Sequence, residues 1–94
     1  MLGIKLKELR ESNGFVQRQI AAELEVDTAY ISKMENGEKQ LSRLHLKKLS
    51  ILYKIEENEL LTLWIADKII KVLEKEKVGK EALQLVMNKE FFND

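Results

Sequence analysis

The sequence predicts an all-α protein, and three observations carry that prediction. Leucine, isoleucine, lysine and glutamate dominate the composition, and these residues favour helices. Proline is absent and glycine occurs only four times, so few helix breakers interrupt the chain. Apolar residues also recur along much of the sequence at the three- and four-residue intervals that place them on one face of a helix.

Composition limits the classes of protein that the chain can represent. Cysteine is absent, which excludes a disulfide framework and a thiolate zinc site. The length of 94 residues is that of one domain, with a modest core. Because no apolar run is long enough for a signal peptide or a membrane span, we expect a cytoplasmic protein without a membrane partner.

The charges balance overall but not along the chain. Sixteen basic residues match sixteen acidic ones, which argues against indiscriminate coating of nucleic acid. Residues 1–54 hold ten basic and seven acidic residues, net +3, whereas residues 55–94 hold six and nine, net −3. This asymmetry fits a half that faces an anionic partner, joined to a half with another role.

Four helices are predicted in the first half of the chain, over residues 4–12, 16–24, 28–36 and 43–54. Asn-Gly pairs end the first and the third, because glycine adopts the left-handed conformation that closes a helix. Asp27 and Ser42 precede the third and fourth helices, and both residue types cap helix N-termini. The apolar positions expected to face inward are Ile4, Leu6, Leu9, Ile20, Ala21, Leu24, Ile31, Met34, Leu44, Leu46, Leu49, Leu52 and Tyr53.

A long fifth helix is predicted over residues 57–75, where glutamates at the start complement the positive end of the helix dipole. Its apolar residues span an arc of roughly 200°, about twice what packing against a single core requires. We therefore expect this helix to pack against two surfaces. Gly79 interrupts the pattern, and a final helix is predicted over residues 80–90.

One segment carries a set of features that occur together in a known family. These are Gln17 at the start of the second helix, Ala21 where two helices would cross, Val26 in the turn, the run Ile31-Ser32-Lys33, and the run Glu35-Asn36-Gly37. In residue types and spacing, residues 17–37 resemble the helix-turn-helix of the Xre/Cro type, the family of lambdoid phage repressors. A looser resemblance covers residues 3–61. The controller proteins of restriction-modification systems are small single-domain members of this family, with comparable length.

The resemblance implies a five-helix, lambda-repressor-like DNA-binding domain over residues 1–59, with a long fifth helix. Residues 60–94 would form a C-terminal helical extension for dimerisation or partner binding. The implied function is sequence-specific binding of double-stranded DNA to control transcription, most simply as a repressor or autoregulator that acts as a homodimer. No cofactor is implied.

The physical requirements of DNA reading select the candidate residues. The major groove admits one α-helix, so a reader presents short or flexible side chains outward from an anchored helix. The residues expected to read bases are Thr28, Ala29, Ser32 and Lys33. Donors near helix ends and in the following loop are expected to contact phosphates, and these are Gln17, Arg18, Tyr30, Asn36, Lys39, Gln40, Ser42 and Arg43.

Three positions depart from the family pattern, and one pair follows it. Val16 stands where the family often has Ser or Thr, so that helix cap is expected to be lost. Glu25 and Lys54 replace preferred glycines, so their turns are expected to be strained or differently shaped. In the family, the positions that match Arg10 and Glu35 pair between the first and third helices, which implies a structural ion pair here.

Other residues have simpler interpretations. Tyr30 could equally stack on the DNA backbone or complete the core. His45 is expected on a helix surface, and with no cysteine or suitably spaced carboxylate it predicts no metal site. Because the sequence holds no set of nucleophile, base and orienting residue and no phosphate loop, we do not expect an enzyme.

The second half of the chain is expected to provide an interface. Trp64 falls toward the polar side of the fifth helix, where an exposed indole would be wasteful, so we expect it in an interface or packed by the C-terminal segment. The full expected set for a dimer or partner is Leu61, Trp64, Ile65, Ile69, Val72, Leu73, Phe91 and Phe92. Two alternatives remain open: an antitoxin-like protein that binds a protein partner through residues 60–94, and a helical module that has the fold without DNA binding. Gln17, Lys33, Asn36 and Arg43 argue against the second.

Overall fold

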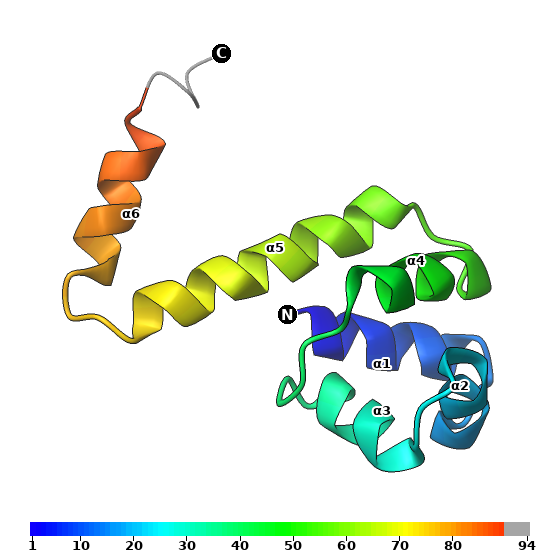
Figure 1. Ribbon diagram of the computed structural model, residues 1–94. Coiled ribbons are helices and arrows are strands. Elements are labelled where there is room, and N and C mark those ends of the chain that lie inside the picture. Colours follow the sequence, from blue (N-terminus) through cyan, green and yellow to red (C-terminus); the bar gives the residue numbers. More distant parts are fainter. Residues whose placement is uncertain (90–94) are drawn as a thin grey trace. The chain divides into compact units, whose positions relative to one another are not determined.

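A computed structural model describes residues 1–89, which form six helices and no strand (Figure 1). This confirms the all-α prediction. The helices are α1 (Leu2–Ser12), α2 (Gln17–Leu24), α3 (Thr28–Glu35), α4 (Arg43–Leu52), α5 (Glu57–Glu74) and α6 (Gly79–Met87). Contacts divide the chain into two units, one of them Met1–Trp64 and the other beginning at Ile65. Within the described range, every helix is too short or too polar to cross a membrane.

The first unit has a single core to which α1 to α4 and the start of α5 all contribute. The fully buried large side chains are Leu6, Ile20, Ile31, Leu46, Leu49 and Leu60. Phe15 packs beside Tyr53 at the edge of this core, with ring centroids 6.3 Å apart. Because Leu60 is buried here and Trp64 packs against the same core, the first unit extends beyond residue 59.

Two residues that we expected to face inward are exposed. Ile4 is 66% exposed, because α1 begins at Leu2 and buries Leu2, Leu6 and Arg10, which lie on the opposite side of the helix. Leu44 is 62% exposed, because the buried side of α4 runs through Leu46, Leu49 and Ser50 instead. In both helices the apolar pattern was correct and its register was wrong at the first turn.

Helices α1 to α4 end in the same way. One residue at each helix end has a positive φ: 73° at Gly14, 57° at Glu25, 79° at Gly37 and 54° at Lys54. The N–H of the next residue then returns to a carbonyl five positions earlier, at 3.0, 3.0, 2.8 and 3.0 Å respectively. This is the Schellman arrangement, which satisfies carbonyls left open at a helix end. Glu25 and Lys54 thus keep the turn shape that glycine would allow without strain.

In the second unit, a tight bend connects the end of α5 to α6. Gly79 does not precede the last helix, as expected, but is its first residue and is buried. A Cβ at this position would lie 2.2 Å from the carbonyl oxygen of Leu73. Only glycine allows α6 to start this close to the end of α5.

The strained turn after α4 gives a first prediction. Replacing Lys54 by Gly should raise the free energy of unfolding by about 0.5–1 kcal/mol, because a non-glycine residue in the left-handed region costs more than the chain entropy that glycine adds. The matched control is Lys47→Gly inside α4, which should lower it by roughly the same amount. Urea unfolding measures both, and a loss of stability in Lys54→Gly would contradict the strain.

Candidate nucleic-acid interface

Helix α3 is anchored along one side and open along the other. Ile31 and Met34 are buried against α2 and the rest of the core, as expected. Thr28, Ala29 and Lys33 are exposed, and Ser32 is half-buried. The helix therefore presents three of the four expected base-reading side chains to solvent.

The start of α3 is fixed by a cap. The Asp27 carboxylate accepts a hydrogen bond from the backbone N–H of Tyr30 at 2.8 Å, as expected for an aspartate at this position. The link from α2 to α3 is only residues 25–27, and its turn is closed by the bond from Val26 N–H to the Ala21 carbonyl. Asp27 is thereby occupied with holding the helix.

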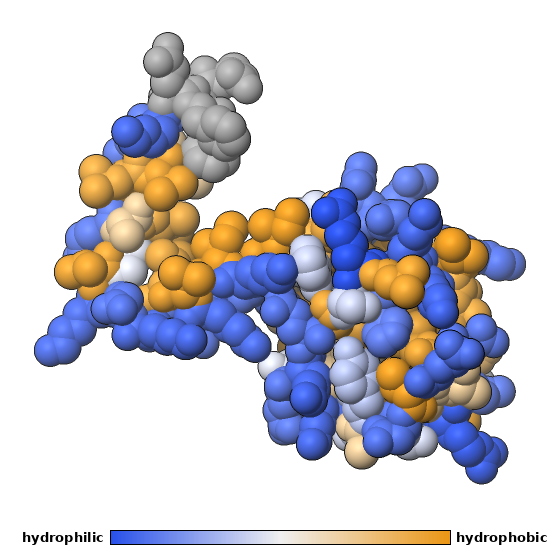
Figure 2. All heavy atoms as spheres, viewed as in Figure 1, coloured by the Kyte–Doolittle hydropathy of each residue, from blue (hydrophilic) through white to orange (hydrophobic). Residues whose placement is uncertain are grey.

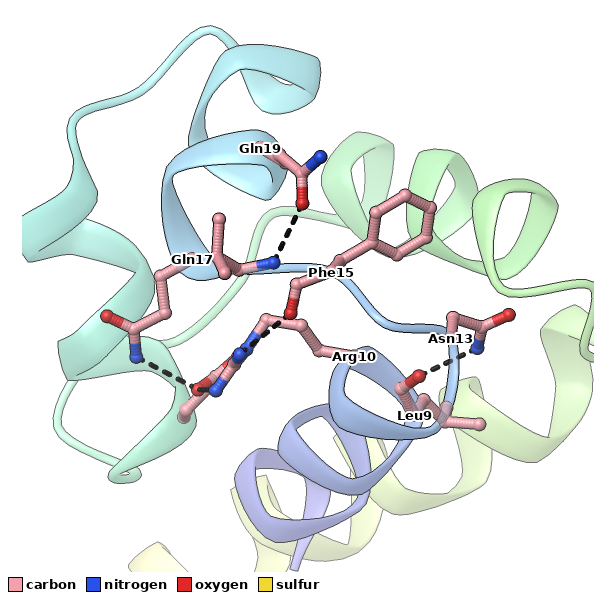
Figure 3. A network of polar contacts seen from close by, with 8 residues as sticks. Leu9, Arg10, Asn13, Phe15, Gln17 and Gln19 are labelled. Carbon is pink, nitrogen blue, oxygen red and sulfur yellow. Dashed lines mark hydrogen bonds and ion pairs between the residues drawn. The ribbon is translucent and has the colours of Figure 1, made fainter.

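The end of α3 is fixed by a buried ion pair. Arg10 Nε donates to Glu35 Oε2 at 2.7 Å, and Arg10 Nη2 donates to Glu35 Oε1 at 3.1 Å (Figure 3). The two side chains are only 11% and 2% exposed. Such a bidentate pair has a defined geometry, since both groups are planar. Its hydrogen bonds to Glu35 raise the pKa of the Arg10 guanidinium, so Arg10 stays charged although it is buried.

Two further groups join this ion pair, and the sequence did not predict either contact. Arg10 Nη1 donates to the carbonyl of Phe15 at 3.0 Å, and Gln17 Nε2 donates to Glu35 Oε1 at 3.1 Å (Figure 3). The network thus joins α1, the α1–α2 turn, the first residue of α2 and the last residue of α3. Gln17, expected to contact phosphate, is half-buried and has one amide hydrogen directed to Glu35.

The start of α2 is capped without the expected Ser or Thr. Val16 has no side-chain acceptor, but the Gln19 side-chain oxygen accepts from the Val16 N–H at 2.8 Å. The Val16 carbonyl in turn accepts from the Gln19 N–H at 3.0 Å. One half of a capping box is therefore retained.

The remaining donors surround α3 at its edges. Arg18, Asn36, Lys39, Gln40 and Arg43 are exposed. Ser42 caps α4, with Oγ accepting from the His45 N–H at 3.1 Å. An open depression of about 400 Å³ lies beside α3, bordered by Val26, Asp27, Ala29, Tyr30, Lys33 and Lys39. It brings together two residues expected to read bases, Ala29 and Lys33, and two expected to contact phosphate, Tyr30 and Lys39.

Tyr30 and His45 are both half-buried and pack together. Tyr30 is half-buried, its hydroxyl lies 3.4 Å from the Gln40 carbonyl, and burial raises its pKa. Its ring meets that of His45 edge to face at 6.0 Å. His45 is therefore half-buried rather than fully exposed on the helix surface, and its Nδ1 is buried. No group of side chains in residues 1–89 could hold a metal ion.

The expected interface residues divide into three groups. Leu61 and Trp64 are half-buried and pack against the core of the first unit, and Trp64 Nε1 donates to the Leu41 carbonyl at 2.9 Å. The spacing of residues along α5 could not predict this hydrogen bond, because its acceptor lies in the loop after α3. Ile65, Ile69 and Val72 are exposed and Leu73 is half-buried. Phe91 and Phe92 lie outside the described residues.

Comparisons with known proteins agree with this geometry. The model of a family described as helix-turn-helix matches residues 6–60. This range includes all the residues expected to contact DNA. The control protein C.MunI of a Mycoplasma species is 39% identical over 59 residues, which cover 62% of this chain and 80% of that protein. No solved structure gives a significant match.

The buried network gives a second prediction. Arg10→Met and Glu35→Gln should each destabilise the domain by about 1–3 kcal/mol, because each leaves the partner charge buried and poorly solvated. The double variant should be less destabilised than the sum of the two, and unfolding of all four proteins measures the coupling. Strictly additive effects would contradict the pairing.

Proposed function

The chain belongs to the helix-turn-helix family of Xre-type DNA-binding regulators, which are not enzymes, and on this basis we propose that it binds double-stranded DNA sequence-specifically as a homodimer to control transcription. The single observation that supports this most strongly is the open side of α3. Short and flexible side chains lie outward on a helix whose two ends are held by a cap and by a buried ion pair.

The base-reading residues in this proposal are Thr28, Ala29, Ser32 and Lys33. A hydroxyl can bond to several base edges, an alanine methyl can contact the thymine methyl, and an ammonium can reach guanine O6 and N7. Thr28, Ala29 and Lys33 have the exposure that such contacts need. Ser32, which is half-buried, would contribute least.

The phosphate contacts would come from the helix ends and the loop that surround α3. We assign this role to Gln17, Arg18, Tyr30, Asn36, Lys39, Gln40, Ser42 and Arg43. Gln17 retains a second amide hydrogen for a phosphate oxygen while the first holds Glu35. Tyr30 makes the weakest case, since it packs against His45. Arg43, exposed at the first position of α4, makes the strongest.

The regulatory role rests on the similarity to a control protein. A small regulator that occupies its own promoter most simply acts as a repressor or autoregulator. A second candidate function, binding of a protein partner through the second unit in the manner of an antitoxin, is favoured by the exposed apolar side chains of that unit.

Removing a base-reading side chain and removing a phosphate-contacting side chain should affect DNA binding differently. Lys33→Ala should cost roughly 1–3 kcal/mol on the best site and flatten the preference at one base pair of each half-site. Arg43→Ala should weaken all sequences alike and reduce the salt slope by about one unit per charge removed. Binding to a site library at several salt concentrations measures both, with Lys7→Ala on α1 as the control. If Lys33→Ala left the base preferences intact, Lys33 would be a phosphate contact only.

If the protein binds DNA as a dimer, its two DNA half-sites should have a defined spacing. Two half-sites with centres about 10 base pairs apart should be bound together far more tightly than one half-site, because two α3 helices then enter successive major grooves on one side of the duplex. Shifting one half-site by about 5 base pairs, half a helical turn, should remove this gain. Equal affinity for both spacings and for a single half-site would rule out a two-fold complex.

A further inference from the structure

The described part of the second unit leaves large apolar side chains exposed along both of its helical segments. Their exposed fractions range from 37% to 71%, and the residues are Ile65, Ile69, Ile70, Val72, Val78, Leu83, Leu85, Val86 and Met87. Figure 2 shows apolar side chains over α6 and along one side of the second half of α5, with charged side chains along its other side. Five of these residues follow helical spacing, as they would on a surface that packs.

Two different apolar faces are left uncovered. On α5, Ile65, Ile69 and Val72 stand at i, i+4 and i+7 and form one stripe. On α6, Leu83 and Val86 stand three apart and form another. The close approach of Gly79 to Leu73 fixes the bend between the two segments.

The amount of surface is close to what one subunit gives to a stable interface. The nine apolar side chains together offer on the order of 700 Å² of surface, about half of it on the five residues of the two stripes, compared with about 800 Å² per partner in a standard complex. The charges of residues 65–89 are mixed, six basic and four acidic, so no single-sign field selects an oppositely charged partner. Surface area and charge both favour a second copy of the same chain as the occupant.

We propose that two copies of this chain form a reciprocal clasp, in which α6 of each copy packs on the Ile65, Ile69 and Val72 stripe of the other copy's α5. In a two-fold dimer, α6 of the first copy packs on α5 of the second, and α6 of the second packs on α5 of the first. The symmetric contact therefore buries both uncovered faces of each copy. The inference rests on the proposed function, because a protein that binds DNA as a dimer needs an interface between its two subunits. It specifies which surfaces form that interface.

Cysteine cross-linking tests the reciprocal contact directly, because the natural chain has no cysteine. Full-length Ile69→Cys and Val86→Cys variants are mixed, unfolded and refolded together, and then oxidised. A disulfide requires Cβ atoms about 3.5–4.5 Å apart, so neighbouring cysteine pairs around positions 69 and 86 are included. The clasp predicts that covalent dimers join one variant to the other. Dimers within each variant alone but not between them would overturn it.

Equilibrium measurements provide the second test. Ile69→Lys should weaken dimerisation about 100-fold in sedimentation experiments, since an ammonium would be buried in an apolar contact. The control is Ile51→Lys, at an isoleucine of the first unit that is more exposed than Ile69 (70% against 46%), which should leave dimerisation unchanged. Circular dichroism checks that both variants remain helical. The reverse result, with only Ile51→Lys dissociating the dimer, would place the interface in the first unit and overturn the clasp.

DNA binding separates failure of this inference from failure of the proposed function. If the cross-links fail while the chain still binds two spaced half-sites, the clasp is wrong and the DNA-binding function stands. If the cross-links form and no duplex is selected from a random library, the clasp stands and the DNA-binding function is wrong.

Discussion

The buried pair of Arg10 and Glu35 is the constraint on which the position of α3 depends. Burying two charges costs desolvation energy, so the pair contributes orientation more than net stability. Its planar geometry defines where the last residue of α3 lies relative to α1. Gly3 reinforces the same contact, since a Cβ there would lie 2.5 Å from the Glu35 carbonyl oxygen. Because Asp27 caps the other end, α3 is held at both ends. The backbone positions from which its outward side chains extend are therefore fixed.

The repeated helix ending gives the first unit its compact turns. Three of the residues that follow the left-handed position are apolar, Phe15, Val26 and Ile55, and all three pack against the core. The apolar contact and the returning hydrogen bond fix the turn even where glycine is absent. This explains how Glu25 and Lys54 can occupy these positions without changing the fold. The cost appears as local backbone strain rather than as a different path of the chain.

Much of this architecture could be predicted from the sequence, because periodicity and capping residues act locally. The structure has α2 and α3 within one residue of their predicted bounds. It also has the caps Asp27 and Ser42 and the ion pair implied by family resemblance. The errors have a common physical origin. Ile4 and Leu44 were misplaced because apolar spacing near a helix start does not define the register. The hydrogen bond of Trp64 was not predicted because its acceptor lies in a loop 23 residues earlier. Contacts between distant segments leave no periodic signal in the sequence.

The bond from Trp64 to the Leu41 carbonyl has a spectroscopic consequence. Trp64 is the only tryptophan of the chain, and its indole is tied to the loop that follows α3 and includes Lys39 and Gln40. Indole emission depends on hydrogen bonding and on access of water, so intrinsic fluorescence of the unlabelled protein reports the state of this loop. A shift in emission on adding a ligand would mean that the loop itself has moved, whereas an unchanged spectrum would describe a surface that is already formed before the ligand arrives.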